Sequence, residues 1–340
     1  ISSGLRWSER FSEVLIQMGF FASKAELQIW MRDKGDHYEY VAVYVDDLLI
    51  CSKDPQAIVN ALVDDHKFKL KGTGPINFHL GCDFFRDEDG NLCYAPRKYI
   101  EKMMSTYERL FGTKPKQASS PLTKGDHPEL DTTALLDDND TAIYQSLIGA
   151  MQWVIQLGRL DIATAVMTLS RFRAAPRHGH LDRVKRIYGY LAKMHDAVIT
   201  IRTEEPDYSD IPKKEYDWFY TCYRGAKEEL PKDLPEPKGK GVTTTSFFDA
   251  NLMHDLISGR SVTGCLHLFN KTPIDWYSKL QSTVETATFG SEYVAGRICT
   301  DQVIDLRLTL RYLGVPVNGS SMVFGDNETI RSLVISLVWR

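Results

Sequence analysis

The sequence predicts an α+β protein with a strand-rich first part, a helical middle, and a last part of strands followed by a long helix. β-branched and aromatic runs broken by turn residues cover 38–51 and 78–94, and apolar residues recur at helical spacing within 143–194. Strand-like runs return after 242, ahead of a helical stripe over 295–313. The 340 residues are 43% hydrophobic and 25% charged, an ordinary globular composition that excludes wholesale disorder or a fibrous repeat.

Composition also narrows the classes of function. No apolar run reaches the roughly 18 residues of a membrane span, and no basic-then-apolar leader opens the chain. The six cysteines show no C-x-x-C spacing, so a reducing, intracellular setting is expected without a disulfide framework or a cysteine zinc site. The net charge of −4, taken alone, argues against a general nucleic-acid binder. Because the first residue is Ile1 rather than Met, we expect an internal piece of a longer polypeptide.

The first part is predicted to hold a helix and two hairpins. A helical stripe that ends at Gly19 contains Phe11, Val14, Leu15 and Met18. Apolar strands on both sides of Asp46 and Asp47 predict a hairpin over 38–51, and the turn residues 87–91 divide the second β-rich region.

The middle is predicted to be helical over 143–155, 162–169 and 183–194, before a strand at 198–201. Seven Lys or Arg between 171 and 193 stand against a single acid. A solvated helix face is the ordinary explanation of such a run. The more specific explanation is a row of side chains that contacts the phosphates of a nucleic acid. The candidate nucleic-acid-binding residues are Arg171, Arg173, Arg177, Arg183, Lys185 and Arg186.

Residues 203–241 are predicted to be a charged linker or surface insertion, because they hold five of the 14 prolines and little periodicity. The aromatic residues within 216–223 indicate that part of this segment packs on the rest of the protein. A new domain is predicted from Val242, with strands near 247–248, 266–269, 274–277 and 322–324. Its long helix is predicted to end at Gly314.

Asp46 and Asp47 are the first candidates for chemistry. Hairpin turns often contain Asp, so turn formation is their ordinary explanation. The flanking strands are apolar over their full length, however, and therefore predict a buried hairpin. A buried carboxylate costs several kcal/mol unless a cation or hydrogen-bond donors compensate it. A magnesium ion bound to carboxylates and substrate phosphates would remove that cost.

The motif at 44–47, Tyr-Val-Asp-Asp, resembles the Tyr-x-Asp-Asp palm motif of reverse transcriptases. Further blocks in the right order resemble the polyprotein of copia-type retrotransposons, and these are 3–7, 68–75, 80–81, 144–149, 159–163 and 180–191. Ordered blocks with fitting spacing are far more specific than a four-residue motif. The resemblance runs from residue 1 to about 330.

The last domain independently resembles the ribonuclease H domain of the same family, in blocks 249–252, 258–264, 273–279, 291–295 and 325–327. Asp249 and Asp326 close predicted strands, and Glu292 lies on the inward stripe of its helix, where an unpaired acid is not expected. Three acids so placed could converge and hold two Mg²⁺ ions. Any one of these three acids could be an unrelated surface residue. That explanation hardly accounts for all three, because each lies in a block that matches the family.

The resemblance implies four segments: the remainder of a reverse-transcriptase palm at 1–120, a helical thumb or connection region at 121–202, the linker at 203–241 and a truncated ribonuclease H-like α/β domain at 242–340. It implies RNA-directed DNA synthesis in which Asp46 and Asp47 are the metal-binding acids and Asp46 is the direct ligand. It also implies cleavage of the RNA strand of a hybrid at Asp249, Glu292 and Asp326.

The implied cofactor is Mg²⁺, with Mn²⁺ as an alternative. The implied partners are an RNA template, a DNA primer, the RNA–DNA hybrid and the remainder of the polyprotein, with no membrane. The cytoplasm is the implied location, with virus-like particles or the nucleus as alternatives.

Two departures from the family pattern lead us to expect incomplete active centres. The family's third palm carboxylate would lie upstream of Ser2, and 332–340 departs from the block that carries a fourth nuclease ligand. A catalytically inactive remnant that retains at most nucleic-acid binding is therefore the main alternative. A third, weaker possibility is a lone metal-dependent nuclease formed by 242–340.

Overall fold

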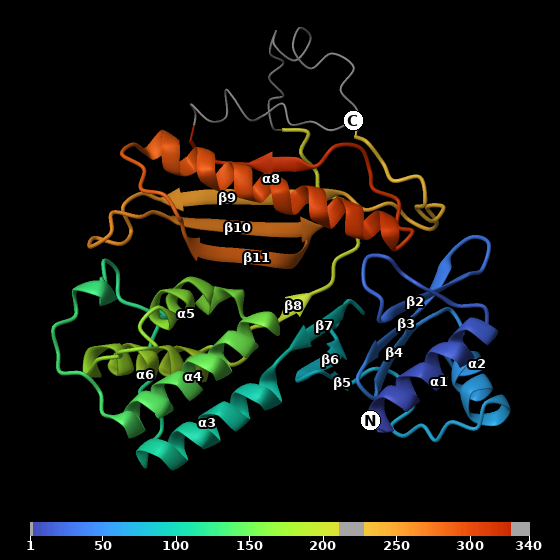
Figure 1. The fold of residues 1–340 in the computed structure, drawn as a ribbon, viewed down its shortest axis with the longest axis horizontal. Helices are drawn as coiled ribbons and strands as arrows, with labels where there is room; N and C mark the ends of the chain where they lie inside the picture. The colour runs from blue at the N-terminus through green and yellow to red at the C-terminus, as the bar shows by residue number, and fades with distance from the viewer. Residues whose placement is uncertain (1–2, 211–227, 328–340) are drawn as a thin grey trace, which may run out of the picture.

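The computed structural model describes residues 3–210 and 228–327 of the chain. It confirms the predicted α+β class, with three four-stranded sheets in the described part of the chain. The first sheet and its helices lie beside a helical region, and a small sheet lies between them (Figure 1). The last sheet and its long helix lie across both (Figure 1).

The first unit is an antiparallel sheet packed against helices. Its elements are α1 (Ser3–Gln17), β1 (Phe21–Ala22), β2 (Ile29–Asp33), β3 (Tyr38–Tyr44), β4 (Asp47–Cys51), α2 (Pro55–Asn60) and the π-helical turn η1 (Ala61–Asp65). The strands pair in the order β1-β2-β3-β4. Leu15 of α1 and Leu62 of η1 are fully buried against Val41 of β3. The predicted helix and the hairpin over 38–51 are thus confirmed.

The second, small sheet joins distant parts of the chain. Its strands are β5 (Phe78–His79), β6 (Cys82–Arg86), β7 (Leu92–Ala95) and β8 (Ile199–Thr200), antiparallel in this order. The predicted turn between β6 and β7 is confirmed, because the Asp87 carboxylate accepts a hydrogen bond of 2.8 Å from the Asn91 backbone N–H.

Four helices form the middle of the described chain, together with two 3₁₀ turns. They are α3 (Arg97–Phe111), η2 (Pro128–Leu130), α4 (Asp138–Gln156), η3 (Leu160–Ile162), α5 (Ala163–Ser170) and α6 (His178–Lys193). The three helices expected from apolar spacing are confirmed. α3 was not expected, because only a narrow stripe of Ile100, Met103 and Tyr107 is buried on an otherwise polar helix.

The last unit is a mixed sheet covered by one helix. Its elements are β9 (Thr244–Asn251), β10 (Val262–Phe269), β11 (Thr272–Leu280), α8 (Thr288–Tyr312) and β12 (Met322–Phe324). The strand order is β11-β10-β9-β12, and β12 runs parallel to β9. Ala295 and Cys299 of α8 pack on Phe248 of β9. On the β11 side, Trp276 packs against the core of the helical region, and Ser278 donates a hydrogen bond of 3.1 Å to Thr164.

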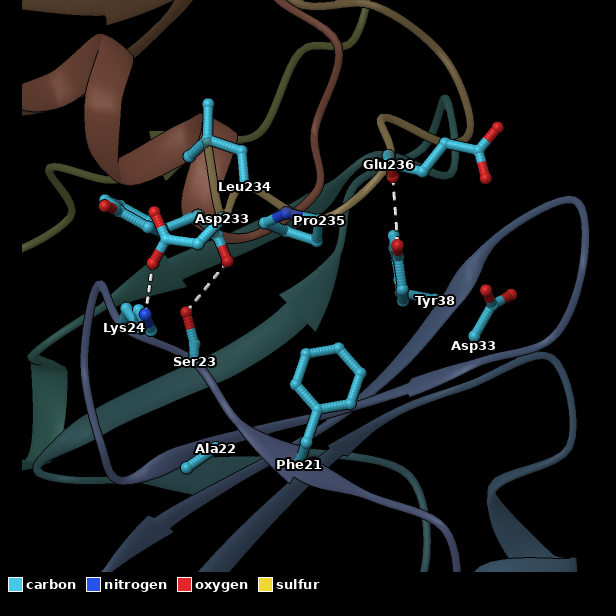
Figure 2. Close-up of a pocket in the computed structure, with 11 residues that line it drawn as sticks. Phe21, Ala22, Ser23, Lys24, Asp33, Tyr38, Asp233, Leu234, Pro235 and Glu236 are labelled. Atoms are coloured by element: carbon cyan, nitrogen blue, oxygen red, sulfur yellow. Dashed lines mark hydrogen bonds and ion pairs between the residues drawn. The ribbon is translucent and has the colours of Figure 1, made fainter. Parts of the chain in front are cut away.

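The end of the predicted linker contacts the first unit and the last unit of the fold. We call residues 228–241 the strap. Glu228 pairs with Arg307 of α8 at 3.0 Å, and the Tyr38 hydroxyl donates to the Glu236 carbonyl at 2.9 Å. A cavity of about 350 Å³ lies between the strap and the first sheet. Figure 2 shows residues that line it. The aromatic residues at 216–223 and the divergent end at 332–340 lie outside the described residues.

None of the helices in the described ranges combines the length and the apolar character needed to cross a bilayer.

Candidate metal centre

Three acids from the last unit converge at one end of its sheet. Asp249 lies on β9, Glu292 on α8, and Asp326 two residues after β12. Each offers a carboxylate oxygen, and these atoms lie within 4.8 Å of one another. Within 3–210 and 228–327, this is the only such group of three His, Cys, Asp or Glu residues.

The strand register explains why the two aspartates meet. Phe324 of β12 pairs with Phe247 of β9 in a parallel ladder. Because parallel strands advance together, two further residues along each chain lead to Asp326 and Asp249. Glu292 reaches the same place from α8, where its Oε1 accepts a hydrogen bond of 3.3 Å from the Ala250 backbone N–H.

Two glycines allow the helix and β12 to close around Phe248. A Cβ atom at Gly325 would lie 2.5 Å from Cζ of the Phe248 ring, and one at Gly296 would lie 3.2 Å from it. Gly325 immediately precedes Asp326. The close approach at Gly325 therefore helps to set the position of the third acid.

We expect Gly325→Ala to destabilise the protein by about 1–3 kcal/mol, because the added methyl group overpacks the contact with Phe248. Urea unfolding would measure this loss. Phe248→Leu in the Gly325→Ala background should recover part of it. Gly264→Ala is the matched control, since a Cβ there has its nearest neighbour at 4.0 Å. Equal stability of the Gly325→Ala variant and the control would contradict the packing argument.

Glu292 is held in an environment that disfavours its charge. The residue is 3% exposed, and its Oε2 is buried with no hydrogen-bond partner in the described structure. Burial raises the pKa of Glu292 to about 7; the Ala250 N–H opposes this, and the charges of Asp249 and Asp326 add to it. A cation among the three carboxylates would relieve both the burial cost and the repulsion.

The donor set suits a hard divalent cation. All three residues offer carboxylate oxygens, which Mg²⁺ and Mn²⁺ prefer over nitrogen or sulfur. Asp249 and Asp326 are exposed while Glu292 is buried, so the cluster has an open side and a closed side. The open side leaves room for a substrate to approach.

Asp46 and Asp47 lie at the tip of the β3–β4 hairpin. Val45 and Asp46 form the turn, and Asp47 begins β4 opposite Tyr44. Both acids are exposed, so the expectation of a buried hairpin is wrong at its tip. On the part of β3 that leads to the tip, Val41 and Val43 face the core and Tyr44 is exposed, since strand side chains point to opposite faces in turn. The burial argument for a cation therefore does not apply to this pair.

The tip is a tight and strained turn rather than an open loop. Val45 has a φ of 57°, which is costly for a β-branched residue. Backbone strain of this kind persists where the surrounding structure fixes it. No third acid of the described residues joins Asp46 and Asp47 in a cluster. Their role in metal binding stays a prediction.

The six candidate basic residues do not form a continuous stripe. Arg171 and Arg173 follow α5, and Arg177 caps α6. On α6, Arg183 pairs with Asp126 at 2.8 Å and with Asp131 at 2.6 Å.

Two further members of the set also contact other side chains of the protein. Lys185 lies 4.6 Å from the centre of the Phe111 ring, and Arg186 donates to Ser120 at 3.0 Å. Arg171 pairs with Asp255, a 1% exposed acid that the sequence pattern did not single out. Asp255 follows no periodic pattern in the sequence, so only its position next to Arg171 in space identifies it as an ion-pair partner.

Comparisons with known proteins agree with the resemblance seen in the motifs. Residues 2–120 match the family model of reverse transcriptase (RNA-dependent DNA polymerase). The putative transposon Ty5-1 protein of Saccharomyces cerevisiae is 26% identical over 85% of this chain and 82% of its own length.

Two plant proteins are also similar. The retrovirus-related Pol polyprotein from transposon TNT 1-94 of Nicotiana tabacum is 27% identical over 91% of this chain, and that from transposon RE1 of Arabidopsis thaliana is 23% identical over 94%. This chain spans only 21% and 19% of their respective lengths. No solved structure matches.

Proposed function

We propose that this chain belongs to a polyprotein that copies RNA into DNA and then removes the RNA strand from the hybrid. The chain is a copia-type retrotransposon reverse-transcriptase region. The convergence of Asp249, Glu292 and Asp326 carries the nuclease part of the proposal. The family match over 2–120, which contains Asp46 and Asp47, supports the polymerase part.

In this proposal the chain divides as the sequence suggests. The palm remainder covers 1–120, the thumb or connection region 121–202, the linker 203–241 and the ribonuclease H-like domain 242–340. The mixed sheet β11-β10-β9-β12 with α8 on one face is consistent with the last assignment.

In this proposal the buried acid and the two exposed acids of the cluster would have different tasks. Glu292, buried and held by the Ala250 N–H, would anchor a Mg²⁺ ion on the closed side, and Asp249 and Asp326 would complete its carboxylate ligands where the hybrid approaches. Divalent cations at such carboxylates orient an attacking oxygen and stabilise the leaving oxygen of a phosphodiester. Asp46 and Asp47 would serve the same chemistry in DNA synthesis, with Asp46 as the direct ligand.

The proposed partners are an RNA template, a DNA primer, their hybrid and the remainder of the polyprotein. Arg173 is the exposed member of the basic set without an acidic partner in the described structure, and it is the strongest candidate for a phosphate contact.

Hybrid cleavage with Mg²⁺ tests the nuclease proposal. We expect Asp249→Asn to lower the cleavage rate by roughly 10³-fold, which corresponds to about 4 kcal/mol of lost transition-state stabilisation. Asp301→Asn is the control, because Asp301 is an exposed acid on the same helix as Glu292. Wild-type cleavage by Asp249→Asn would overturn the proposal. Cleavage by neither wild type nor variants, with or without upstream polyprotein sequence, would favour the inactive remnant.

Primer extension on an RNA template tests the polymerase proposal. We expect Asp46→Asn and Asp47→Asn each to lower extension by roughly 10²-fold or more in protein that carries the upstream sequence. Their folding should be unchanged, because both side chains are exposed. Asp89→Asn, in the exposed turn between β6 and β7, is the matched control. Extension at the wild-type rate by both variants would contradict the assignment of the acid pair.

A further inference from the structure

We infer that Arg171 is a positioning residue for the nuclease centre rather than a nucleic-acid contact. It has this role because it clamps the β9–β10 loop (252–261) onto the helical region. The inference rests on the proposed function of the acid cluster. It also reassigns one of the six residues that the charge pattern predicts for phosphate binding.

The clamp is an ion pair between two units of the fold. Arg171 caps the C-terminus of α5 and pairs with Asp255, which is 1% exposed. The other acceptor capacity of Asp255 is taken by Ser258, whose backbone N–H and hydroxyl donate at 2.6 and 2.7 Å. Burial alone would raise the pKa of Asp255, but the bonds from Arg171 and Ser258 outweigh it and lower the pKa to about 2. The acid is therefore ionised and needs its cation.

A second contact fastens the same loop. The Leu256 backbone N–H donates to the Glu129 carboxylate at 3.0 Å. Glu129 lies in η2, has a side chain that is 3% exposed, and also contacts His127 at 2.9 Å. The loop is thus held at two adjacent positions by the helical region.

Buried polar contacts connect this loop to the acid cluster. The Asp255 N–H donates to the Arg260 carbonyl at 3.1 Å, and the carbonyl of the next residue, Ser261, accepts from the Gln281 N–H at 2.8 Å. The Gln281 side chain is 3% exposed and donates at 2.8 Å to the carbonyl of Ser291, which precedes Glu292.

The other end of the loop follows Asn251, two residues after Asp249. A shift of the loop would therefore move the supports of two of the three acids. Loss of Arg171 would leave the Asp255 carboxylate buried without a cation, which forces the loop to open toward water. Groups that orient metal ligands from outside typically change metal affinity 10- to 100-fold when they are removed.

The test compares Arg171→Met with Arg173→Met in the full chain, using Mn²⁺ as the probe. The electron paramagnetic resonance signal of free Mn²⁺ reports binding without any need for activity. Hybrid affinity is measured at several salt concentrations, since a lost phosphate contact lowers the salt slope by about one. Arg171→Lys, and Arg171→Met combined with Asp255→Asn, provide rescue variants, because asparagine removes the unpaired charge and still accepts from Ser258.

We expect Arg171→Met to weaken Mn²⁺ binding by about 10-fold or more with an unchanged salt slope, and the added Asp255→Asn to recover part of that loss. Arg173→Met should bind Mn²⁺ as the wild type does but should lose about one unit of the salt slope, because Arg173 is the proposed phosphate contact. Wild-type Mn²⁺ affinity in Arg171→Met, or a reduced salt slope with unchanged Mn²⁺ affinity, would overturn the inference. If Arg171→Met does not fold, Arg171→Lys and the Arg171→Met/Asp255→Asn double variant decide, and failure of both to bind Mn²⁺ better than Asp255→Arg alone would also overturn it.

The same measurement separates this inference from the proposed function. Measured in an Asp46→Asn background, so that the proposed polymerase acids do not contribute, Glu292→Gln should abolish tight Mn²⁺ binding if the acid cluster is a metal centre. Unchanged Mn²⁺ binding in Glu292→Gln would refute the metal centre itself, whatever Arg171→Met shows. Weakened binding in Glu292→Gln but not in Arg171→Met would refute only the clamp.

Discussion

Glu292→Gln is expected to lose hybrid cleavage by roughly 10³-fold and yet to be more stable than the wild type at pH 8 in EDTA. The reason is that Glu292 is almost fully buried between two other acids, with Oε2 lacking a hydrogen-bond partner in the described structure. Glutamine has a similar shape, carries no charge and can donate to Asp249 or Asp326. The acid is thus retained at a cost to the metal-free fold, as is common at functional sites.

The raised pKa of Glu292 determines the direction in which the stability of the wild type changes with pH. Burial raises the pKa of Glu292 from 4.5 in the unfolded chain to about 7 in the fold. The folded state therefore holds the proton more tightly, so the stability linked to this group is complete below about pH 4.5 and is lost as the pH rises through about 7. At pH 8 the ionised group costs up to about 3 kcal/mol, which Glu292→Gln avoids.

Thermal unfolding in EDTA between pH 4.5 and pH 8 measures the effect. The wild type should lose stability across this range relative to Glu292→Gln, and the two should converge near pH 4.5. Added Mg²⁺ should stabilise the wild type by mass action but not the variant. Asp301→Asn should follow the wild type, since this acid is exposed. A variant less stable than the wild type at pH 8 in EDTA would contradict the picture of an uncompensated buried acid.

The acid cluster could be anticipated from the sequence because its members carry separate signals. Glu292 sits on the apolar stripe of α8, and Asp249 follows a run of β-forming residues. Local patterns of this kind indicate which face of an element is buried. They do not give distances between elements; those depend on the parallel register of β12 with β9 and on the Gly325 contact.

The hairpin tip and the basic run show where local patterns mislead. The apolar strands around Asp46 predicted burial, but a pattern cannot state which sheet face is covered at the end of a strand. The basic run likewise looked uncompensated along the chain. Its partners Asp126, Asp131 and Asp255 are distant in sequence, so charge pairing across the fold could not be counted in advance.

Tyr38→Ala is expected to destabilise the protein by about 3 kcal/mol and to expose the strap to proteases. Tyr38 is 8% exposed at the junction of the first sheet, the strap and the end of α8. Its ring lies so close to Gly314 that a Cβ atom there would be 2.4 Å from the ring, and its hydroxyl points to the Glu236 carbonyl in Figure 2. Alanine would remove both contacts and leave a void beside the existing cavity.

The matched variant Tyr38→Phe removes only the hydrogen bond to Glu236, so it should cost about 1 kcal/mol and keep the strap protected. Urea unfolding measures the stability of both variants, and limited proteolysis within 228–241 measures the release of the strap. The two readouts should move together in Tyr38→Ala, because the ring packs where three segments of the chain meet. Wild-type protease resistance in Tyr38→Ala would mean that the ion pairs of Glu228 and Lys238 hold the strap without the ring.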